Sequence, residues 1–367
     1  MKYLFVVQGE GRGHFTQALS LKSMLERNGH EVVAVMVGGS AKRRLPDFFT
    51  NKINSEIIQF QSPNFLPTPK GKQSFLFVSI LYNITVLPIF LQSILTIRHT
   101  ILDHQPDVVI NFYELLCGIT YGLFNPGPPM INVAHQYYFL TPAFKYTGKN
   151  INQFKLLNFY TRLTSINSFK ILALSFREEK TLQYGKIAIV PPLLRKEVLH
   201  QQTSEGDYIH GYMINTGFAK ELIQWSKNNP NQKLHFFWDK KNGKRTEKIT
   251  PKLSLHQLSD ALFLQFMAYS KAYATTGGFE SVCEAMYMQK PVLMVPTHIE
   301  QECNVLDAIH SGAGVSSNKF DLDLLIGFVP SYKKTMAFNY WSRTAENSFM
   351  LELTSLQSNI STIVTAI

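Results

Sequence analysis

Short apolar segments alternate with helical patterns along the whole chain, and this alternation restricts the fold more than any other feature. Strand candidates in the first series lie at 3–7, 32–37, 108–112, 130–133, 171–174 and 187–190. Between the first two, apolar residues recur at helical spacing over 16–27. Strands that alternate with helices form a parallel sheet with helices on both faces. The first part of the chain is therefore predicted to be a doubly wound α/β domain.

A polar stretch at 201–207 (QQTSEGD) follows this series and is the best candidate for an interdomain linker. Beyond it, further strands are expected at 208–215, 234–238, 272–275 and 292–295, with a helix at 219–228. The sequence therefore predicts two doubly wound domains in tandem, residues 1–200 and residues 208–330.

The excess of basic residues lies entirely in the first domain. The chain of 367 residues has a formal net charge of +10. Residues 1–200 hold 21 Lys and Arg against 11 Asp and Glu, whereas residues 201–367 hold 15 of each kind. A basic domain suits nucleic acid, an anionic membrane surface or a phosphorylated ligand. Because the sequence contains no nucleic-acid-binding motif, a nucleic-acid partner is not expected.

Residues 73–97 (QSFLFVSILYNITVLPIFLQSILTI) contain no charged side chain and are long enough to span a bilayer. Polar residues such as Asn83 and Gln92, and Pro88 in the middle, argue against a spanning helix. Two interpretations remain open. The segment is either a buried helix pair in a large core or an apolar surface that docks at the membrane interface beside a basic domain.

The chain is predicted to be cytoplasmic. Its first apolar run is short and ends in a glycine-rich turn, unlike a cleavable signal peptide. The three cysteines form no CxxC pair, so neither a disulfide framework nor a zinc ribbon is expected. If the apolar segment docks on lipid, the protein would be peripheral on the inner face of the membrane.

The turn after the first strand, residues 8–14 (QGEGRGH), opens a helix and is the first candidate site. Gly11 and Gly13 allow the backbone to approach a ligand closely. The spacing differs from the GxGxxG of dinucleotide-binding units, and the second strand does not end in an acidic residue. A dehydrogenase is therefore a weak interpretation.

His14 is the candidate general base. The partial positive charge at a helix N-terminus disfavours imidazolium, which leaves a neutral imidazole. The alternative is a histidine that only caps the turn. A base needs an orienting carboxylate, for which Glu114 after the third strand and Glu10 are the candidates. His135, after the fourth strand, is either a turn residue or an acceptor contact.

A second candidate site begins at a strand that leads into Thr276-Gly277-Gly278 and then a helix over 279–289. Such a helix N-terminus presents backbone N–H groups to an anion, and the hydroxyls of Thr275 and Ser281 add donors. This arrangement suits a diphosphate.

Further along, three polar residues suit a sugar nucleotide. Glu284 on the same helix either accepts hydrogen bonds from a ribose diol or faces solvent. Glu300 and Gln301 follow the next strand and either read sugar hydroxyls or belong to an acid-rich helix N-terminus.

Residues 274–314 resemble the donor-binding signature of GT-B glycosyltransferases. The matching residues are Thr276, Gly277-Gly278, Phe279, Glu280-Ser281, Glu284, Lys290-Pro291, Pro296 and Glu300-Gln301. The N-terminal QGEGRGHFTQALSLKSMLERNGHEV resembles the glycine loop and first helix of the same family. Across both domains, the chain is similar to lipid-linked UDP-N-acetylglucosamine transferases and diacylglycerol glycosyltransferases.

The resemblance implies two Rossmann-like domains that face a central cleft. Residues 1–200 would bind the acceptor and 208–330 the nucleotide-sugar, while 331–367 would form helices that pack back toward the N-terminal domain. Residues 201–207 and 332–356 would act as hinges when the domains close.

An inverting transfer is predicted, and because the helix N-terminus at Gly277-Gly278 would stabilise the leaving diphosphate, neither a metal nor a cofactor is expected. The resemblance implies residue roles in this transfer. Gly277, Gly278 and Ser281 would face the donor diphosphate. Glu284 would hold the ribose, and Glu300 and Gln301 the transferred sugar. His14 would deprotonate the acceptor, with Glu114 or Glu10 stabilising the imidazolium that forms.

Two residues depart from the family pattern, and alternative functions remain. Thr276 stands where many members have His. Glu280 stands where many have Asn, and an acid beside a diphosphate is unfavourable unless it turns away. The alternatives are a UDP-sugar 2-epimerase and a non-catalytic nucleotide-sugar-binding protein at the membrane.

Overall fold

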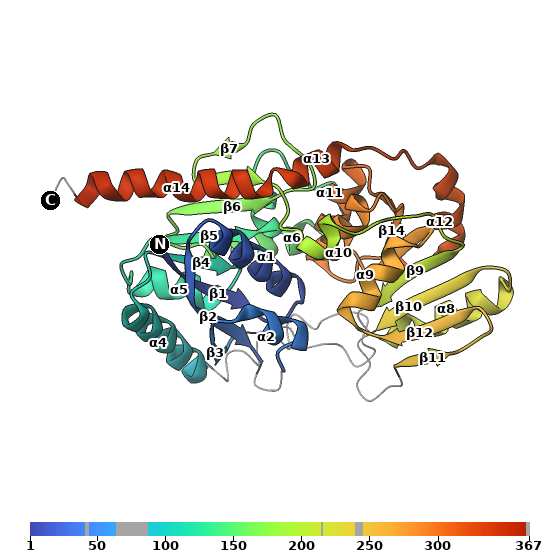
Figure 1. Cartoon of the computed structure of the whole chain (residues 1–367), viewed down its shortest axis with the longest axis horizontal. Helices are drawn as coiled ribbons and strands as arrows, with labels where there is room; N and C mark the ends of the chain where they lie inside the picture. The colour runs from blue at the N-terminus through green and yellow to red at the C-terminus, as the bar shows by residue number, and fades with distance from the viewer. Residues whose placement is uncertain (41–43, 64–86, 214–215, 239–244, 365–367) are drawn as a thin grey trace.

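The computed structural model describes residues 1–40, 44–63, 87–213, 216–238 and 245–364. Two α/β domains lie side by side, and each is built around a mainly parallel sheet with helices on both faces (Figure 1). The predicted fold class is therefore confirmed.

The N-terminal sheet has its switch point at β1, where the strand order changes direction. In spatial order its described strands are β3 (Glu56–Gln61), β2 (Glu31–Gly39), β1 (Lys2–Gln8), β4 (Val108–Phe112), β5 (Met130–Ala134), β6 (Lys170–Leu174), β8 (Ile187–Val190) and β7 (Gln183–Tyr184). Neighbouring strands run parallel except β7 and β8. In open α/β sheets, ligands bind outside the carboxyl ends of the strands at such a point.

Alternate residues of β1 face opposite sides of the sheet and so determine the two helical layers. Within its described residues, this domain has the helices α1 (Gly13–Arg27), α2 (Asp47–Ile53), α4 (Leu87–His104), α5 (Leu115–Leu123), α6 (Ile151–Leu163) and α7 (Lys196–Leu199), with the 3₁₀ helix η1 (His135–Leu140). Phe5 and Val7 share a core with Leu21 of α1. Leu4 shares the opposite core with Ile97 of α4.

The C-terminal sheet repeats this topology, with β9 in the place of β1. Its described strands are, in order, β11 (Thr246–Lys248), β12 (Leu253–Gln257), β10 (Lys233–Trp238), β9 (Tyr208–Met213), β13 (Ala272–Thr275), β14 (Val292–Met294) and β15 (Gly314–Ser316). The helices are η2 (Thr216–Phe218), α8 (Ala219–Asn228), α9 (Asp260–Ala268), α10 (Phe279–Tyr287), α11 (Ile299–His310), α12 (Leu322–Phe328) and η3 (Val329–Ser331). The strand expected at 208–215 ends at Met213, and residues 214–215 lie outside the described part.

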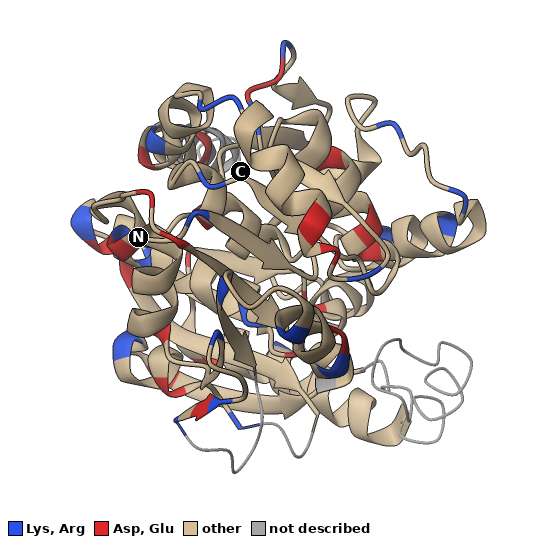
Figure 2. Cartoon of the chain, turned by 90° about the vertical axis from the view of Figure 1, so that its right-hand side faces the viewer, with Lys and Arg blue, Asp and Glu red and all other residues tan. Residues whose placement is uncertain are grey.

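Charges of both signs lie interspersed on the side of the molecule that Figure 2 presents. This is the end at which the C-terminal domain lies in Figure 1. The mixture agrees with the equal numbers of basic and acidic residues in 201–367.

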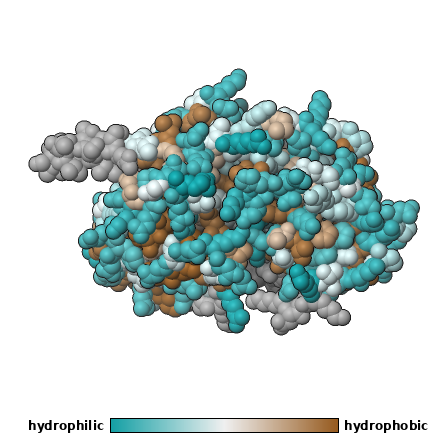
Figure 3. All heavy atoms as spheres, in the orientation of Figure 1, coloured by the Kyte–Doolittle hydropathy of each residue, from teal (hydrophilic) through white to brown (hydrophobic). Residues whose placement is uncertain are grey.

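The uncharged segment 73–97 is only partly described, because residues 73–86 lie outside the described residues. Its remainder begins α4, which has apolar side chains on both its buried and its exposed face. The buried face of α4 consists of Phe90, Ile94, Ile97 and Ile101. Its outer face includes Leu87 (53% exposed), Leu91 (53%) and Leu95 (44%). The described part of the segment therefore combines a core face with an exposed apolar face, and Figure 3 shows apolar atoms at several places on the surface.

None of the helices in the described part of the chain combines the length and the apolar character that crossing a bilayer requires.

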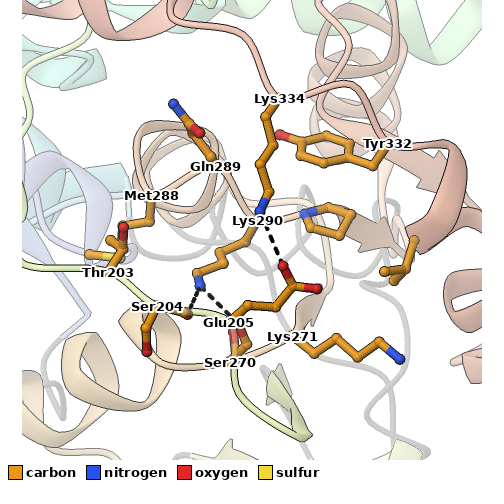
Figure 4. A pocket seen from close by; sticks show the side chains of 12 residues that line it. Thr203, Ser204, Glu205, Ser270, Lys271, Met288, Gln289, Lys290, Tyr332 and Lys334 are labelled. Carbon is orange, nitrogen blue, oxygen red and sulfur yellow. Dashed lines mark hydrogen bonds and ion pairs between the residues drawn. The ribbon is translucent and has the colours of Figure 1, made fainter.

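The linker packs on the C-terminal domain, where Lys290 anchors it (Figure 4). The Lys290 ammonium donates to the backbone carbonyls of Ser204 (2.6 Å) and Ser270 (2.8 Å). Lys334 pairs with Glu205 at 3.2 Å. Burial lowers the pKa of Lys290 to about 8. These contacts hold Ser204 and Glu205 of the linker against the C-terminal domain.

The last two helices, α13 (Ala337–Arg343) and α14 (Ala345–Val364), contact the N-terminal domain. Trp341 donates its indole N–H to the Ser175 carbonyl at 3.1 Å. Glu346 of α14 pairs with Arg27 at 2.7 Å, and Glu352 pairs with Lys170. In Figure 1, α14 extends along the N-terminal domain. The chain thus crosses from one domain to the other twice.

Candidate active site

A cavity of about 710 Å³ lies between the two domains. Its wall is built by the loop after β1, the first turns of α1, η1, the loop after β13, α10 and the start of α11. The predicted site residues that line it are Glu10, Gly11, Gly13, His14, His135, Thr275, Thr276, Gly278, Ser281, Glu284, Glu300 and Gln301. Glu114 and Gly277 are not part of this wall.

His14 lies in the first turn of α1, which begins at Gly13 rather than at residue 16. Its ring stacks on Tyr113, with 5.9 Å between the ring centroids. Burial lowers the pKa of His14, and neither the Gln17 hydrogen bond nor the negative charge of Glu300 offsets this. The imidazole is therefore neutral at pH 7.

Gln17 determines which nitrogen of His14 carries the proton. The two side chains are three residues apart on α1 and therefore adjacent, and His14 Nδ1 lies 3.1 Å from Gln17 Oε1. The Gln17 amide N–H₂ donates to Glu280 Oε1, which turns its carbonyl oxygen toward His14. A carbonyl only accepts, so Nδ1 is protonated and Nε2 is the basic nitrogen.

Glu280 reaches across the domain boundary from α10. Its carboxylate lies against Gly13 as well as Gln17, and a Cβ at Gly13 would overlap it. Burial raises the pKa of Glu280 to about 7, and the nearby Glu284 and Glu300 act in the same direction. The acid that was expected to be unfavourable beside a diphosphate therefore turns toward α1.

Glu114, one of the two carboxylates considered as the partner of His14, binds other groups. Glu114 Oε1 accepts hydrogen bonds from Ser62 Oγ (2.5 Å) and from the backbone N–H of Leu116 (3.1 Å). Glu114 is thus the N-cap of α5, and burial raises its pKa to about 7. Glu10 does line the cavity, and its Oε1 accepts from the backbone N–H of Ser40 at 2.7 Å. The sequence shows that Glu114 and Glu10 follow strands, but it does not show which groups they bind.

The turn before α10 positions the N-terminus of that helix at the cavity. Gly278 is the N-cap, and the first N–H groups of a helix have no partner within it. Gly277 has a φ of +83°, and a Cβ there would lie 2.7 Å from Val305 Cγ2. Gly277 therefore shapes the turn, while Thr276, Gly278 and Ser281 line the cavity. This N-terminus can accept an anion.

Glu284 lines the cavity and is paired with Arg195, a residue that the sequence did not identify. Arg195 Nε lies 2.7 Å from Glu284 Oε1, and its Nη1 lies 2.6 Å from Asp260 Oδ2. Arg195 comes from the end of the N-terminal domain and lines the cavity too. It is an isolated arginine outside any motif, so no signal in the sequence singled it out.

Two predicted sugar contacts, Glu300 and Gln301, lie at the start of α11. Gln136 of η1 donates its amide to Glu300 Oε1 at 2.9 Å across the domain boundary. Gln301 Oε1 accepts from the backbone N–H (3.0 Å) and the hydroxyl (2.9 Å) of Thr297. Both residues line the cavity. Gln136 was missed because its role depends on the opposite domain.

His135 joins the domains through its ring. Its Nδ1–H donates to the Leu174 carbonyl at 2.7 Å, and the ring stacks on Phe279 with centroids 4.0 Å apart. Burial lowers the pKa of His135 to about 3, so it stays neutral. Nearby, Arg177 and Asp307 form an ion pair of 2.5 Å between the domains. The structure is thus closed around the cavity.

Among the residues that the structure describes, no group of three or more His, Cys, Asp or Glu side chains is arranged to hold a metal ion.

Solved structures with the same architecture match almost the whole chain. The glycotransferase of kitacinnamycin is 14% identical, with a TM-score of 0.59 over 94% of this chain and 95% of that one. Phytolacca americana UGT2, complexed with UDP-2fluoro-glucose and pterostilbene, is 13% identical, with a TM-score of 0.64 over 97% and 99%. Acinetobacter baumannii MurG is 12% identical, with a TM-score of 0.54 over 97% and 100%.

These likenesses establish the fold, which is GT-B, as the sequence resemblance implied. No curated protein sequence matches the chain. A family profile described as Glycosyl transferase family 1 matches residues 1–331, a span that includes both walls of the cavity. The chain belongs to glycosyl transferase family 1.

Proposed function

We propose that the protein is an inverting glycosyltransferase that moves a sugar from a UDP-sugar to an acceptor hydroxyl. The observation that carries this proposal is the interdomain cavity, where His14 and the N-terminus of α10 line the same space. One wall supplies a neutral base, and the other supplies donors for an anionic leaving group.

His14 Nε2 takes the proton of the acceptor hydroxyl as its oxygen attacks the anomeric carbon. The bond between that carbon and the diphosphate oxygen breaks, and the nucleoside diphosphate leaves with the electron pair. Thr276, Gly278 and Ser281 stabilise its charge together with the first N–H groups of α10. Because the helix supplies this stabilisation, we propose that no metal ion or cofactor is required, and EDTA should leave the rate unchanged.

Glu284, Glu300 and Gln301 keep the roles that the resemblance implies for them. Glu300 and Gln301 contact the transferred sugar, and Glu284 accepts the ribose hydroxyls through the oxygen that does not bind Arg195. A UDP-linked donor is supported by two structurally similar proteins. Phytolacca americana UGT2 is complexed with UDP-2fluoro-glucose, and a transferase from Siraitia grosvenorii is in complex with UDP.

We further propose a lipid or lipid-linked acceptor at a membrane surface to which the protein binds peripherally. This is supported by the exposed leucines of α4 in the N-terminal domain and by the basic excess of residues 1–200. Apolar side chains at an anionic surface gain from both burial and charge.

Substitution of His14 by Ala tests the base. The purified chain is incubated with UDP-[¹⁴C]glucose or UDP-N-acetyl[¹⁴C]glucosamine and phosphatidylglycerol vesicles that contain diacylglycerol, and label in the organic phase is counted. A general base contributes about 100-fold or more, so His14→Ala should lose at least that much transfer. UDP binding should persist as a thermal shift, since a ligand at about 100 times its Kd stabilises by roughly 2.7 kcal/mol.

His310→Ala, at an exposed position of α11, is the matched control and should transfer at the wild-type rate. Full transfer by His14→Ala would remove His14 as the base. Acceptor-free conversion of one UDP-sugar into another would favour a 2-epimerase, and UDP binding without any turnover would favour a non-catalytic binding protein.

A further inference from the structure

The side chain that orients the candidate base is itself held by the opposite domain. His14 and Gln17 lie on α1 of the N-terminal domain, whereas Glu280 lies on α10 of the C-terminal domain. Hydrogen bonds join them in the order His14, Gln17, Glu280. Glu10 accepts a hydrogen bond from the backbone N–H of Ser40, and Glu114 accepts one from the Ser62 hydroxyl.

We propose that Glu280 is a positioning residue: through the Gln17 amide, the C-terminal domain fixes which nitrogen of His14 is unprotonated, so that the base is ready only when the domains are closed. The proposal rests on the function proposed above. It adds that readiness for proton transfer is a property of the closed arrangement and not of the N-terminal domain alone.

The tautomer of His14 depends on which end of the Gln17 amide faces it. Ionised Glu280 only accepts hydrogen bonds, so it holds the N–H₂ end of Gln17 and presents the carbonyl end to His14. Without Glu280, the amide can turn and donate to Nδ1. The proton would then reside on Nε2, the atom that must receive the acceptor proton, and the histidine could not act as a base there.

The absence of a side chain at Gly13 leaves room for the contact between Glu280 and Gln17. The Glu280 carboxylate packs where a side chain at residue 13 would lie, so a larger residue there would force the carboxylate out of its present position. Charged or titratable groups near the relay include Tyr113 and Glu300 beside His14, and Cys283, Glu284 and Glu300 beside Glu280.

The tautomer of His14 is measured directly by ¹⁵N NMR on the full chain labelled with ¹⁵N-histidine. The signal is assigned by its loss in His14→Gln. In the wild type, with and without UDP, Nδ1 should show the shift of a protonated nitrogen and Nε2 that of an unprotonated one. In Glu280→Gln and Gln17→Leu, a population with the proton on Nε2 should appear.

Glu302→Gln is the matched control. Glu302 also bridges the domains, since it accepts from Tyr146 (2.7 Å) and Asn150 (2.8 Å), but it does not line the cavity. This variant should leave the His14 tautomer as in the wild type. An unchanged tautomer in both folded relay variants, or a wild-type His14 with its proton on Nε2, would overturn the proposal.

Kinetics give a second readout. In Glu280→Gln, kcat should fall about 10-fold or more while the KM for the UDP-sugar changes little, because the lost interaction acts on the base. The wild-type kcat should rise with pH through about 7, as Glu280 ionises, and this limb should vanish in Glu280→Gln. A fall in stability or donor affinity alone, with kcat and the pH limb intact, would mean a merely structural role.

The two proposals can fail separately. The NMR measurement needs no acceptor and decides the relay by itself. The transfer assay decides whether the chain is a glycosyltransferase.

Discussion

Burial raises the pKa of the carboxyl groups of both Glu114 and Glu280 to about 7. Their surroundings differ. Glu114 is fully buried inside the N-terminal domain and caps α5, whereas Glu280 lies at the domain boundary beside the cavity. A sequence indicates which residues follow a strand, but the direction of a side chain depends on partners such as Ser62 that come from elsewhere in the chain.

Substitution of Glu114 by Gln should make the protein more stable relative to the wild type as the pH rises. The folded pKa of about 7 exceeds the unfolded value of about 4.3, so folded Glu114 binds more protons between these values. Its contribution to stability is therefore complete below about pH 4 and is lost as pH rises through about 7. An amide keeps the accepting oxygen and removes this dependence.

The measurement is the free energy of unfolding by urea at about pH 5 and about pH 8. Between these two pH values, the free energy of unfolding of Glu114→Gln should rise by about 1 to 3 kcal/mol relative to that of the wild type. Glu31→Gln, on the exposed first residue of β2, is the control and should show no such change. A constant difference for Glu114→Gln would contradict the prediction.

Much of the cavity wall could be predicted because glycine turns and strand ends mark it in the sequence. Gln136 and Arg195 could not, since each is an isolated polar residue whose partner lies in the other domain. Gln17 did have a signal, because it lies three residues after His14 on a predicted helix. Its role could not be predicted, because its partner Glu280 lies in the other domain.

At the scale of elements, boundaries were predicted well where a turn residue marks them. The helix at 219–228 and the strands at 108–112, 187–190 and 272–275 coincide with the structure. Helix α1 begins at Gly13, three residues before the predicted start, because the end of the glycine-rich loop already forms the first turn of the helix. The uncharged segment left two interpretations open because α4 has both a buried and an exposed apolar face.

Loss of the exposed face of α4 should weaken membrane binding. Leu91 and Leu95 are 53% and 44% exposed, so replacing both by Ser should leave the core intact. A leucine buried in an apolar phase gains about 1.5 to 3 kcal/mol, so the double variant should bind phosphatidylglycerol vesicles at least about 10-fold more weakly. Sedimentation with the vesicles measures this.

Leu324→Ser on α12 of the C-terminal domain is the control, because Leu324 is similarly exposed at 41%. It should sediment like the wild type. Equal vesicle binding by the α4 double variant would remove α4 from the proposed docking surface.

At the scale of the whole molecule, the order of two similar domains followed from the pattern of strands and helices. The contacts between the two domains could not be predicted from this pattern, because these contacts join residues far apart in the chain. Trp341 is one such residue: it is 6% exposed and bonds to the Ser175 carbonyl. α13 thereby attaches the C-terminal helices to the N-terminal domain.

Substitution of Trp341 by Ala should lower the free energy of unfolding by about 3 to 5 kcal/mol, because it leaves a large cavity and an unpaired carbonyl. Leu351→Ala on the outer side of α14, where the side chain is 70% exposed, should cost little. Urea titrations of both variants measure the difference, and similar values for the two would contradict the assignment.

The two crossings of the chain make the C-terminal domain an insertion within the N-terminal one. The chain enters this insertion at the linker held by Lys290 and leaves it along α13, which contacts both α10 and the N-terminal domain. An insertion of this kind is an exchangeable cassette. A chimera with a different donor specificity would need both joints cut together, and the transplanted piece would need its own partner for Gln17, because a foreign residue in place of Glu280 would alter the host's histidine.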